Sequence, residues 1–270
     1  MLANRVEDDS ATANKAKGIH DQRIHQMAQD VNKDAQEAKK QNLTGKKQYS
    51  KQQLFCEHIF ELLPYKQTHE ALKNEDLAAL QVLLCKFVTD IAIDIWEHTW
   101  DHVSDKKEKK NLLKALVYLD ALITLYRMPP VFEFQMGDLS HRFRGVKEEA
   151  LEQIIKKFCT IGLVEQGDRK KGKPQNDDCQ YKLMKSKEQI KVLMLHIIGL
   201  VVHLQSTQSA KISFLSRILK KEDKELKNYC TELGFRLEPC KSVDKETGKE
   251  FDDLIATLRP GAKATKKADE

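Results

Sequence analysis

The sequence predicts a mainly α-helical protein with small β wings, built from two similar units in tandem. After residue 54 apolar residues recur at helical spacing, and in two places three helical segments precede two short alternating segments. In both places the loop between the alternating segments contains glycine and several lysines. Three helices followed by a basic hairpin is the order of a winged-helix domain, so the sequence predicts two such domains.

The first unit spans residues 106–185 and opens with a long amphipathic helix that Pro129-Pro130 ends. Its apolar stripe contains Leu112, Leu116, Leu119, Ile123 and Tyr126. A short second helix from Met136 to Phe143 and a third from Lys147 to Phe158 are separated by Gly145. Two short helices joined by a tight glycine turn are typical of a helix-turn-helix.

The two predicted strands of the first unit, Leu163–Glu165 and Cys179–Leu183, flank a loop with four basic residues. These residues are Arg169, Lys170, Lys171 and Lys173. A helix-turn-helix pattern also occurs in protein-docking modules, and a run of charges is often only a solvated loop. The recurrence of the whole order later in the chain favours the winged-helix interpretation.

The second unit spans residues 186–259. Its predicted helices are Lys187–Leu204, Ile212–Leu219, with Phe214, Leu215 and Ile218 facing inward, and Lys224–Leu233, with Gly234 suited to the C-cap. Its predicted strands are Phe235–Leu237 and Leu254–Leu258, and the loop between them holds Lys241, Lys245 and Lys249. Residues 190–204 are apolar nearly all the way round. This helix should therefore be packed on two sides and join both units into one rigid body.

Three further segments flank the two units. Residues 1–53 are polar without a sustained apolar stripe, which predicts a flexible or partly helical linker. Residues 54–105 predict a helical segment packed on the winged helices, with Leu77 and Leu80 among the residues on its apolar face. Residues 260–270 carry lysines but no large side chains, which predicts a disordered basic tail.

The charge of the chain is distributed unevenly. The formal net charge is +5, with 10 basic against 7 acidic residues in 1–55, 3 against 10 in 56–105, and 33 against 24 in 106–270. The basic excess therefore lies on the two winged helices. An excess of that sign attracts phosphate backbones and makes binding depend on salt.

The third helix and the wing are the elements of a winged helix that approach a duplex. In the first unit they carry Lys147, Lys156, Lys157, Arg169, Lys170, Lys171 and Lys173, and in the second unit Lys220, Lys221, Lys224, Lys227, Arg236 and Lys241. Nearly all are lysines, which act as point charges, whereas reading guanine favours arginine. We therefore expect backbone contacts with double-stranded DNA and weak sequence preference. The simpler interpretation of any single lysine is a solvated surface charge.

No motif predicts catalysis or a cofactor. The sequence has no glycine-rich phosphate loop, nucleophile elbow or catalytic carboxylate pair, so we expect a non-enzyme without a small-molecule substrate. His98 and His102 have metal-ligand spacing but no third ligand nearby, and Trp96 and Trp100 are expected as core or interface aromatics. The six cysteines form no CxxC pair, which predicts reduced thiols in a nuclear or cytosolic protein. The apolar run 190–204 is too short to cross a bilayer, so no membrane association is expected.

Several short motifs carry a family resemblance through their order and spacing, although none is specific alone. They are Asn4-Arg5-Val6, Leu119–Ile123 with Tyr126-Arg127, and Leu193–Ile197 with Leu215–Lys220. Together they resemble the forty-nine-kilodalton subunit of RNA polymerase I, called a polymerase-associated factor in animals. The resemblance implies a tandem winged-helix domain related to the general factor TFIIE, binding DNA near the polymerase cleft. It implies no catalytic residues.

The same resemblance implies a nuclear and nucleolar protein that supports initiation and elongation on ribosomal RNA genes. Its implied partners are double-stranded DNA, other RNA polymerase I subunits and polymerase I initiation factors. The family also has an N-terminal dimerisation module, and the sequence is expected to begin after it. Beside the DNA-binding subunit, the residues leave open a winged-helix docking scaffold without direct DNA binding. The basic excess after residue 106 favours the first function, and the lack of catalytic motifs argues against an enzyme.

Overall fold

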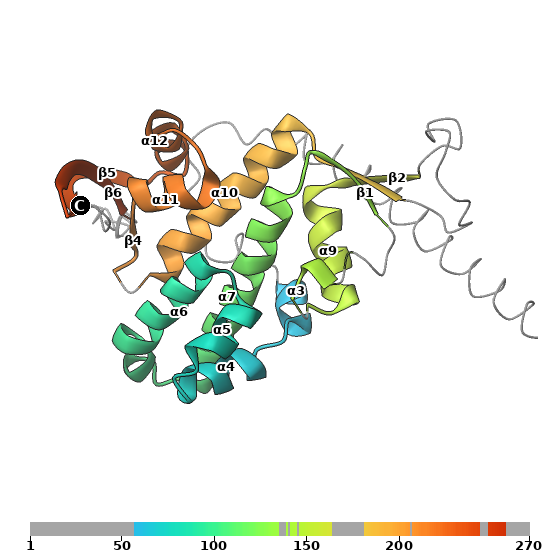
Figure 1. Cartoon of the computed structure of the whole chain (residues 1–270), viewed down its shortest axis with the longest axis horizontal. Helices are drawn as coiled ribbons and strands as arrows, with labels where there is room; N and C mark the ends of the chain where they lie inside the picture. The colour runs from blue at the N-terminus through green and yellow to red at the C-terminus, as the bar shows by residue number, and fades with distance from the viewer. Residues whose placement is uncertain are drawn as a thin grey trace, which may run out of the picture.

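The computed structural model describes residues 57–134, 139, 141–144, 146–163, 181–205, 207–243 and 248–257. These residues form a mostly helical protein with two small antiparallel sheets (Figure 1). The helices are α3 (Glu57–Leu62), α4 (Lys66–Lys73), α5 (Leu77–Leu83), α6 (Lys86–His98), the 3₁₀ turn η1 (Trp100–His102), α7 (Lys106–Arg127), α9 (Glu148–Phe158), α10 (Lys187–Leu204), α11 (Ile212–Leu219) and α12 (Asp223–Glu232). The strands are β1 (Val131–Phe134), β2 (Thr160–Leu163), β3 (Tyr181–Met184), β4 (Ser209–Lys211), β5 (Arg236–Val243) and β6 (Glu250–Thr257).

The two long helices α7 and α10 pack against each other at the centre of the molecule (Figure 1). In α7 the Asp105 carboxylate accepts a hydrogen bond from the Lys107 amide and caps the first turn. In α10 the side chains of Ser186 and Gln189 form a reciprocal capping box. Nearly every residue of α10 after Val192 is buried, and the helix also contacts α9, α6 and β4. The prediction that this helix is packed on two sides is therefore confirmed.

A closely similar order of elements occurs twice among the described residues, and α11 is the one element of the second repeat without a described counterpart in the first. The first repeat comprises α7, β1, α9, β2 and β3, and the second repeat comprises α10, β4, α11, α12, β5 and β6. The sheet of the first repeat has the strand order β1-β3-β2, and that of the second has the corresponding order β4-β6-β5. All four strand pairings are antiparallel. In both sheets the last strand of the repeat therefore lies between the other two.

The strand predictions need several corrections. The sequence analysis missed β1 and β4, which have four and three residues, because segments this short show too little alternation to be recognised. β2 begins at Thr160, before the predicted start, and β5 extends to Val243 instead of ending at Leu237. Lys241 consequently lies within a strand and not in the loop. The predicted linker 1–53, the first basic loop, half of the helix 136–143 and the tail 260–270 lie outside the described residues.

The acidic segment before α7 folds as the short helices α3 to α6: α4, α5 and α6 cluster at one end of α7, and α3 packs between α7 and α9 (Figure 1). The Asp120 carboxylate of α7 accepts a hydrogen bond of 2.7 Å from the Cys85 amide and so caps α6 from the neighbouring helix. The prediction that this segment packs on the rest of the chain is confirmed by contacts of α3 and α6 with α7. Leu77, predicted on the buried face, is instead 50% exposed, because α5 begins there and turns that side chain to solvent.

Two lysines are buried in the core and close the C-terminal ends of helices. The Lys114 ammonium donates to the backbone carbonyls of Phe60 and Glu61 at the end of α3. The Lys185 ammonium donates to the carbonyls of Leu125 and Met128, which lie at 2.5 and 2.8 Å at the end of α7. Burial lowers the pKa of both ammonium groups. Each lysine thus supplies the hydrogen-bond donors that a buried helix end lacks.

Phe214 does not face the core of the second repeat as predicted. Leu215 and Ile218 of α11 are fully buried, but Phe214 is half-buried and meets the ring of Phe87 edge to face at 6.4 Å. Phe87 belongs to α6, so helix α6 covers this side of α11. The helical segment therefore touches both repeats.

Candidate nucleic-acid interface

In the first repeat the predicted DNA-contacting lysines lie at both ends of α9. The buried side of this helix contains Ala150, Leu151, Ile154, Ile155 and Phe158. Lys147 is the N-cap residue and is exposed, whereas Lys156 and Lys157 are half-buried in the last turn. The Lys157 ammonium lies 5.3 Å from the centre of the Phe158 ring. Lys147 and Lys156 are about 14 Å apart along the helix, so one helix presents positive charge at two separate points.

The four basic residues of the first predicted wing, Arg169, Lys170, Lys171 and Lys173, lie outside the described residues. The strands β2 and β3 that lead into and out of this segment pair from Thr160↔Met184 to Leu163↔Tyr181. The contribution of these four residues to a nucleic-acid interface stays a prediction.

In the second repeat Lys220, Lys224 and Lys227 are exposed around the turn from α11 to α12. Lys220 is the C-cap of α11 and has a left-handed backbone with φ +50°. Lys224 and Lys227 are three residues apart on α12 and therefore share one face of that helix. Within the described part of the chain none of the three forms an ion pair. They are the basic side chains of this repeat that are most available to a phosphate backbone.

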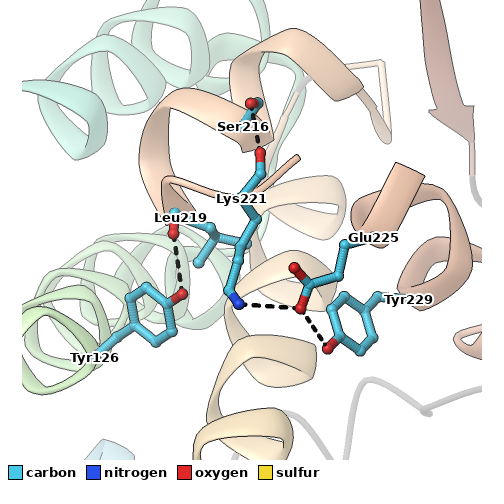
Figure 2. A network of polar contacts seen from close by, with 6 residues as sticks. All are labelled: Tyr126, Ser216, Leu219, Lys221, Glu225 and Tyr229. Atoms are coloured by element: carbon cyan, nitrogen blue, oxygen red, sulfur yellow. Dashed lines mark hydrogen bonds and ion pairs between the residues drawn. The ribbon is translucent and has the colours of Figure 1, made fainter. Parts of the chain in front are cut away.

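Lys221 takes part in a polar network within the second repeat, beside a hydrogen bond that joins the two repeats (Figure 2). Its ammonium lies 3.0 Å from a Glu225 carboxylate oxygen, which also accepts a hydrogen bond of 2.9 Å from the Tyr229 hydroxyl. Tyr126 at the end of α7 donates its hydroxyl to the Leu219 carbonyl at the end of α11, at 2.9 Å. The hydrogen bond to Glu225 raises the pKa of Lys221, and burial raises the pKa of Tyr229 to about 12. Lys221 thus acts first as a structural contact within the second repeat.

Arg236 and Lys241 are also paired with neighbouring carboxylates. The Arg236 guanidinium lies 2.9 Å from Glu238 on the same strand, and the Lys241 ammonium contacts Asp252 on the facing strand. Exposed ion pairs of this kind contribute only about 0–1 kcal/mol, so a phosphate group is able to compete for either cation. The role of Arg236 and Lys241 at a DNA surface stays a prediction. Because both cations are paired, they offer a phosphate backbone less positive charge than the sequence alone suggested.

Sequence analysis overlooked the arginines beside β1. Arg142 is exposed and its guanidinium lies 4.9 Å from the centre of the Phe132 ring. Arg144 is exposed in the turn before α9 and has a positive φ of 45°. Their position in the sequence could have revealed them, because they flank Phe143 directly before the predicted third helix of the first unit. Because arginine reads guanine and phosphate bidentately, these two residues extend the candidate surface at the N-terminal end of α9.

The described residues contain no other grouping that indicates chemistry. Within them no three histidine, cysteine, aspartate or glutamate residues lie close enough to hold a metal ion, and no helix has the length and apolarity needed to cross a membrane. His98 and His102 are both exposed. Cys159 and Cys230 are buried free thiols, and burial raises the pKa of each to about 12. Such thiols are protonated at neutral pH and make poor nucleophiles.

Comparison with protein families identifies the chain. Residues 46–260 match the family of A49-like RNA polymerase I associated factors. The chain belongs to this family. The match includes both repeats and the helical segment α3–α6, so the whole described structure lies inside it. A search of curated proteins finds no significant match.

Membership in the A49-like family has three direct consequences. The protein has a role in RNA polymerase I transcription, and its family is that of an associated factor rather than a catalytic subunit. Other subunits of RNA polymerase I are its expected neighbours. The resemblance found in the sequence to the forty-nine-kilodalton subunit family is therefore confirmed.

Proposed function

We propose that the protein is a non-catalytic, DNA-binding subunit of RNA polymerase I that supports initiation and elongation on ribosomal RNA genes in the nucleolus. In this proposal residues 106–185 and 186–259 are two winged-helix domains, and residues 54–105 pack on them. Residues 1–53 and 260–270 are the linker and the basic tail. The partners are double-stranded DNA, other polymerase I subunits and polymerase I initiation factors.

The observation that carries this proposal is the repeated order of elements. A helix, an edge strand, a third helix and a hairpin whose last strand is central occur in both repeats, with strand orders β1-β3-β2 and β4-β6-β5. This order is the one expected of a winged helix, in which the third helix and the wing approach DNA. The third helices are α9 and α12, which carry Lys147 and the pair Lys224 and Lys227 at exposed positions.

The chemistry of these side chains supports binding with weak sequence preference. Lysine ammonium groups bind phosphate oxygens without a fixed geometry, whereas base recognition in the major groove relies on bidentate side chains. Two winged helices held together by α7 and α10 would present two lysine patches at a fixed spacing on one duplex.

Charge-neutralising variants of the full chain test this proposal. Lys147→Gln, Lys224→Gln and Lys227→Gln together should weaken binding to a labelled duplex and make it less dependent on salt, by about one unit of slope for each phosphate that is no longer neutralised. Since all three side chains are exposed, the melting temperature should stay the same. Changing Arg169, Lys170, Lys171 and Lys173 together to Ala should have the same two effects.

A matched control removes three lysines from the acidic segment. Lys66, Lys73 and Lys86 are exposed on α4 and α6, and Lys66→Gln, Lys73→Gln and Lys86→Gln change the net charge by the same amount. This control should retain most of the affinity. Equal losses in both triple variants would mean that only net charge matters, and the proposed surface would be wrong.

A docking scaffold without direct DNA binding is the second candidate function. It is favoured by the ion pairs of Lys221, Arg236 and Lys241, since these three of the nine proposed DNA-contacting residues that the structure describes have carboxylate partners. The scaffold predicts no duplex binding even at low salt. The same titration therefore separates the two functions.

A further inference from the structure

The outer surface of α6 and η1 carries two parallel stripes of side chains. Acidic residues recur at positions i, i+4, i+7 and i+11, namely Asp90, Asp94, Glu97 and Asp101. Apolar residues that are only half-buried recur beside them at Ile93, Trp96 and Trp100. The fully buried residues Val88, Ile91, Ala92 and Ile95 lie on the opposite side. At 3.6 residues per turn, Asp90, Asp94 and Glu97 of α6 therefore face away from the core, with Ile93 and Trp96 along one flank, and Trp100 and Asp101 follow in the 3₁₀ turn η1.

The aromatic ridge already holds a cation. The rings of Trp96 and Trp100 lie against each other with centroids 4.7 Å apart, and the His69 ring of α4 lies 5.6 Å from Trp100. The Lys109 ammonium of α7 lies 4.9 Å from the centre of the Trp100 ring. This geometry is a cation–π contact, so the ridge presents ring faces that accept ammonium or guanidinium groups.

The acidic stripe adds charge of the matching sign. Carboxylates at i, i+4 on a helix repel one another and slightly destabilise it. Among the described residues Asp90, Glu97 and Asp101 form no ion pair that offsets this repulsion, and residues 56–105 contain only 3 basic against 10 acidic residues. The same charge repels a phosphate backbone, which argues against nucleic acid as the occupant.

We propose that this outer face of α6 and η1 docks a lysine- and arginine-rich segment of another protein. The aliphatic stems of such side chains pack on Ile93 and the tryptophan rings, while their charged ends reach the carboxylates. The face lies on elements other than those with the candidate DNA-contacting lysines. In Figure 1 α6 is at the lower left, whereas α9 is at the right and α12 at the top. Binding here is therefore separable from DNA binding.

Intrinsic fluorescence of the full chain tests the proposal, because Trp96 and Trp100 are its two tryptophans. The probe is an amphipathic helical peptide of leucine and lysine, and its counterpart of leucine and glutamate serves as the opposite-charge control. The lysine peptide should produce a saturable change in tryptophan emission, and the glutamate peptide should produce none. Asp90→Asn, Glu97→Gln and Asp101→Asn together should weaken binding of the lysine peptide about tenfold, since three exposed ion pairs of modest strength are lost.

The matched control neutralises three exposed carboxylates that lie outside α6, η1 and the candidate DNA surface, with Glu61→Gln, Glu70→Gln and Glu75→Gln. It should retain wild-type affinity for the lysine peptide, and both triple variants should bind duplex DNA equally well. The proposal is overturned if neither peptide changes the emission, if both peptides bind equally, or if the control variant weakens the lysine peptide as much as the α6 variant. Failure of DNA binding alone would leave the docking result untouched.

Discussion

Acid should destabilise the protein through His196, which is buried where α10 packs on α9. The side chain is 5% exposed, and its Nδ1 atom lies 2.9 Å from the Val192 carbonyl oxygen. The ring meets Phe158 of α9 edge to face at 5.0 Å. Burial, together with the nearby positive charge of Lys157, lowers the pKa of His196 from 6.5 to about 4. The folded protein therefore holds this imidazole neutral at pH values where the unfolded chain protonates it.

The sign and size of the effect follow from proton linkage. Between pH 6.5 and about 4 the unfolded chain binds more protons at this position than the folded chain, so the free energy of unfolding falls as the pH falls. The full difference in pKa corresponds to about 3 kcal/mol, of which about 2 kcal/mol should be lost by pH 5. The stabilisation is complete above pH 6.5.

Urea denaturation of the full chain at pH 7 and pH 5 measures this loss. The variant His196→Met keeps an apolar side chain of similar size and should lose about 2 kcal/mol less than the wild type between these two pH values. His98→Met, which replaces an exposed histidine of α6, should behave like the wild type. If His196→Met and the wild type lose the same free energy, His196 is protonated in the folded state and the argument is wrong.

Two further substitutions test how the core holds the repeats together. Leu200→Asp places a carboxylate at a fully buried position of α10 and should lower the free energy of unfolding by several kcal/mol. Amide hydrogen exchange should then become faster in both repeats. Faster exchange in the second repeat alone would show that the two repeats are independent units. Lys185→Met removes the donor from the carbonyls at the end of α7 and should cost about 1–3 kcal/mol in chemical denaturation. Lys187→Met, at an exposed position two residues later, should cost almost nothing, and equal losses in both variants would refute the capping role of Lys185.

The long helices were predictable because their sequence signal is strong. α7 and α10 follow apolar patterns that extend over four turns or more, and each has a polar cap residue, Asp105 or Ser186, at its start. Short strands carry no such signal. β1 and β4 are defined by pairing with β3 and β6, which lie far along the chain, so a local pattern could not identify them.

The candidate site was only partly predictable for a similar reason. The exposure of Lys224 and Lys227 follows from their place on the polar side of α12, and that of Lys147 from its position at the start of α9. The pairing of Lys241 with Asp252 depends on the register of the β5–β6 hairpin. The sequence analysis placed Lys241 in a long loop between two short strands, and such a loop does not specify which residues pair. The buried Lys185 contradicts the usual exposure of lysine, and only the position of the α7 end explains it.

The salt dependence of duplex binding tests the central claim most directly. Binding of the full chain to a fluorescently labelled DNA duplex is measured by anisotropy from low to physiological salt, with duplexes of unrelated sequence. The account predicts affinity in about the micromolar range, little difference between sequences, and a linear fall of log affinity with log salt of about 0.9 per neutralised phosphate. Affinity that stays flat with salt, or no binding at low salt, would contradict it and favour the docking scaffold.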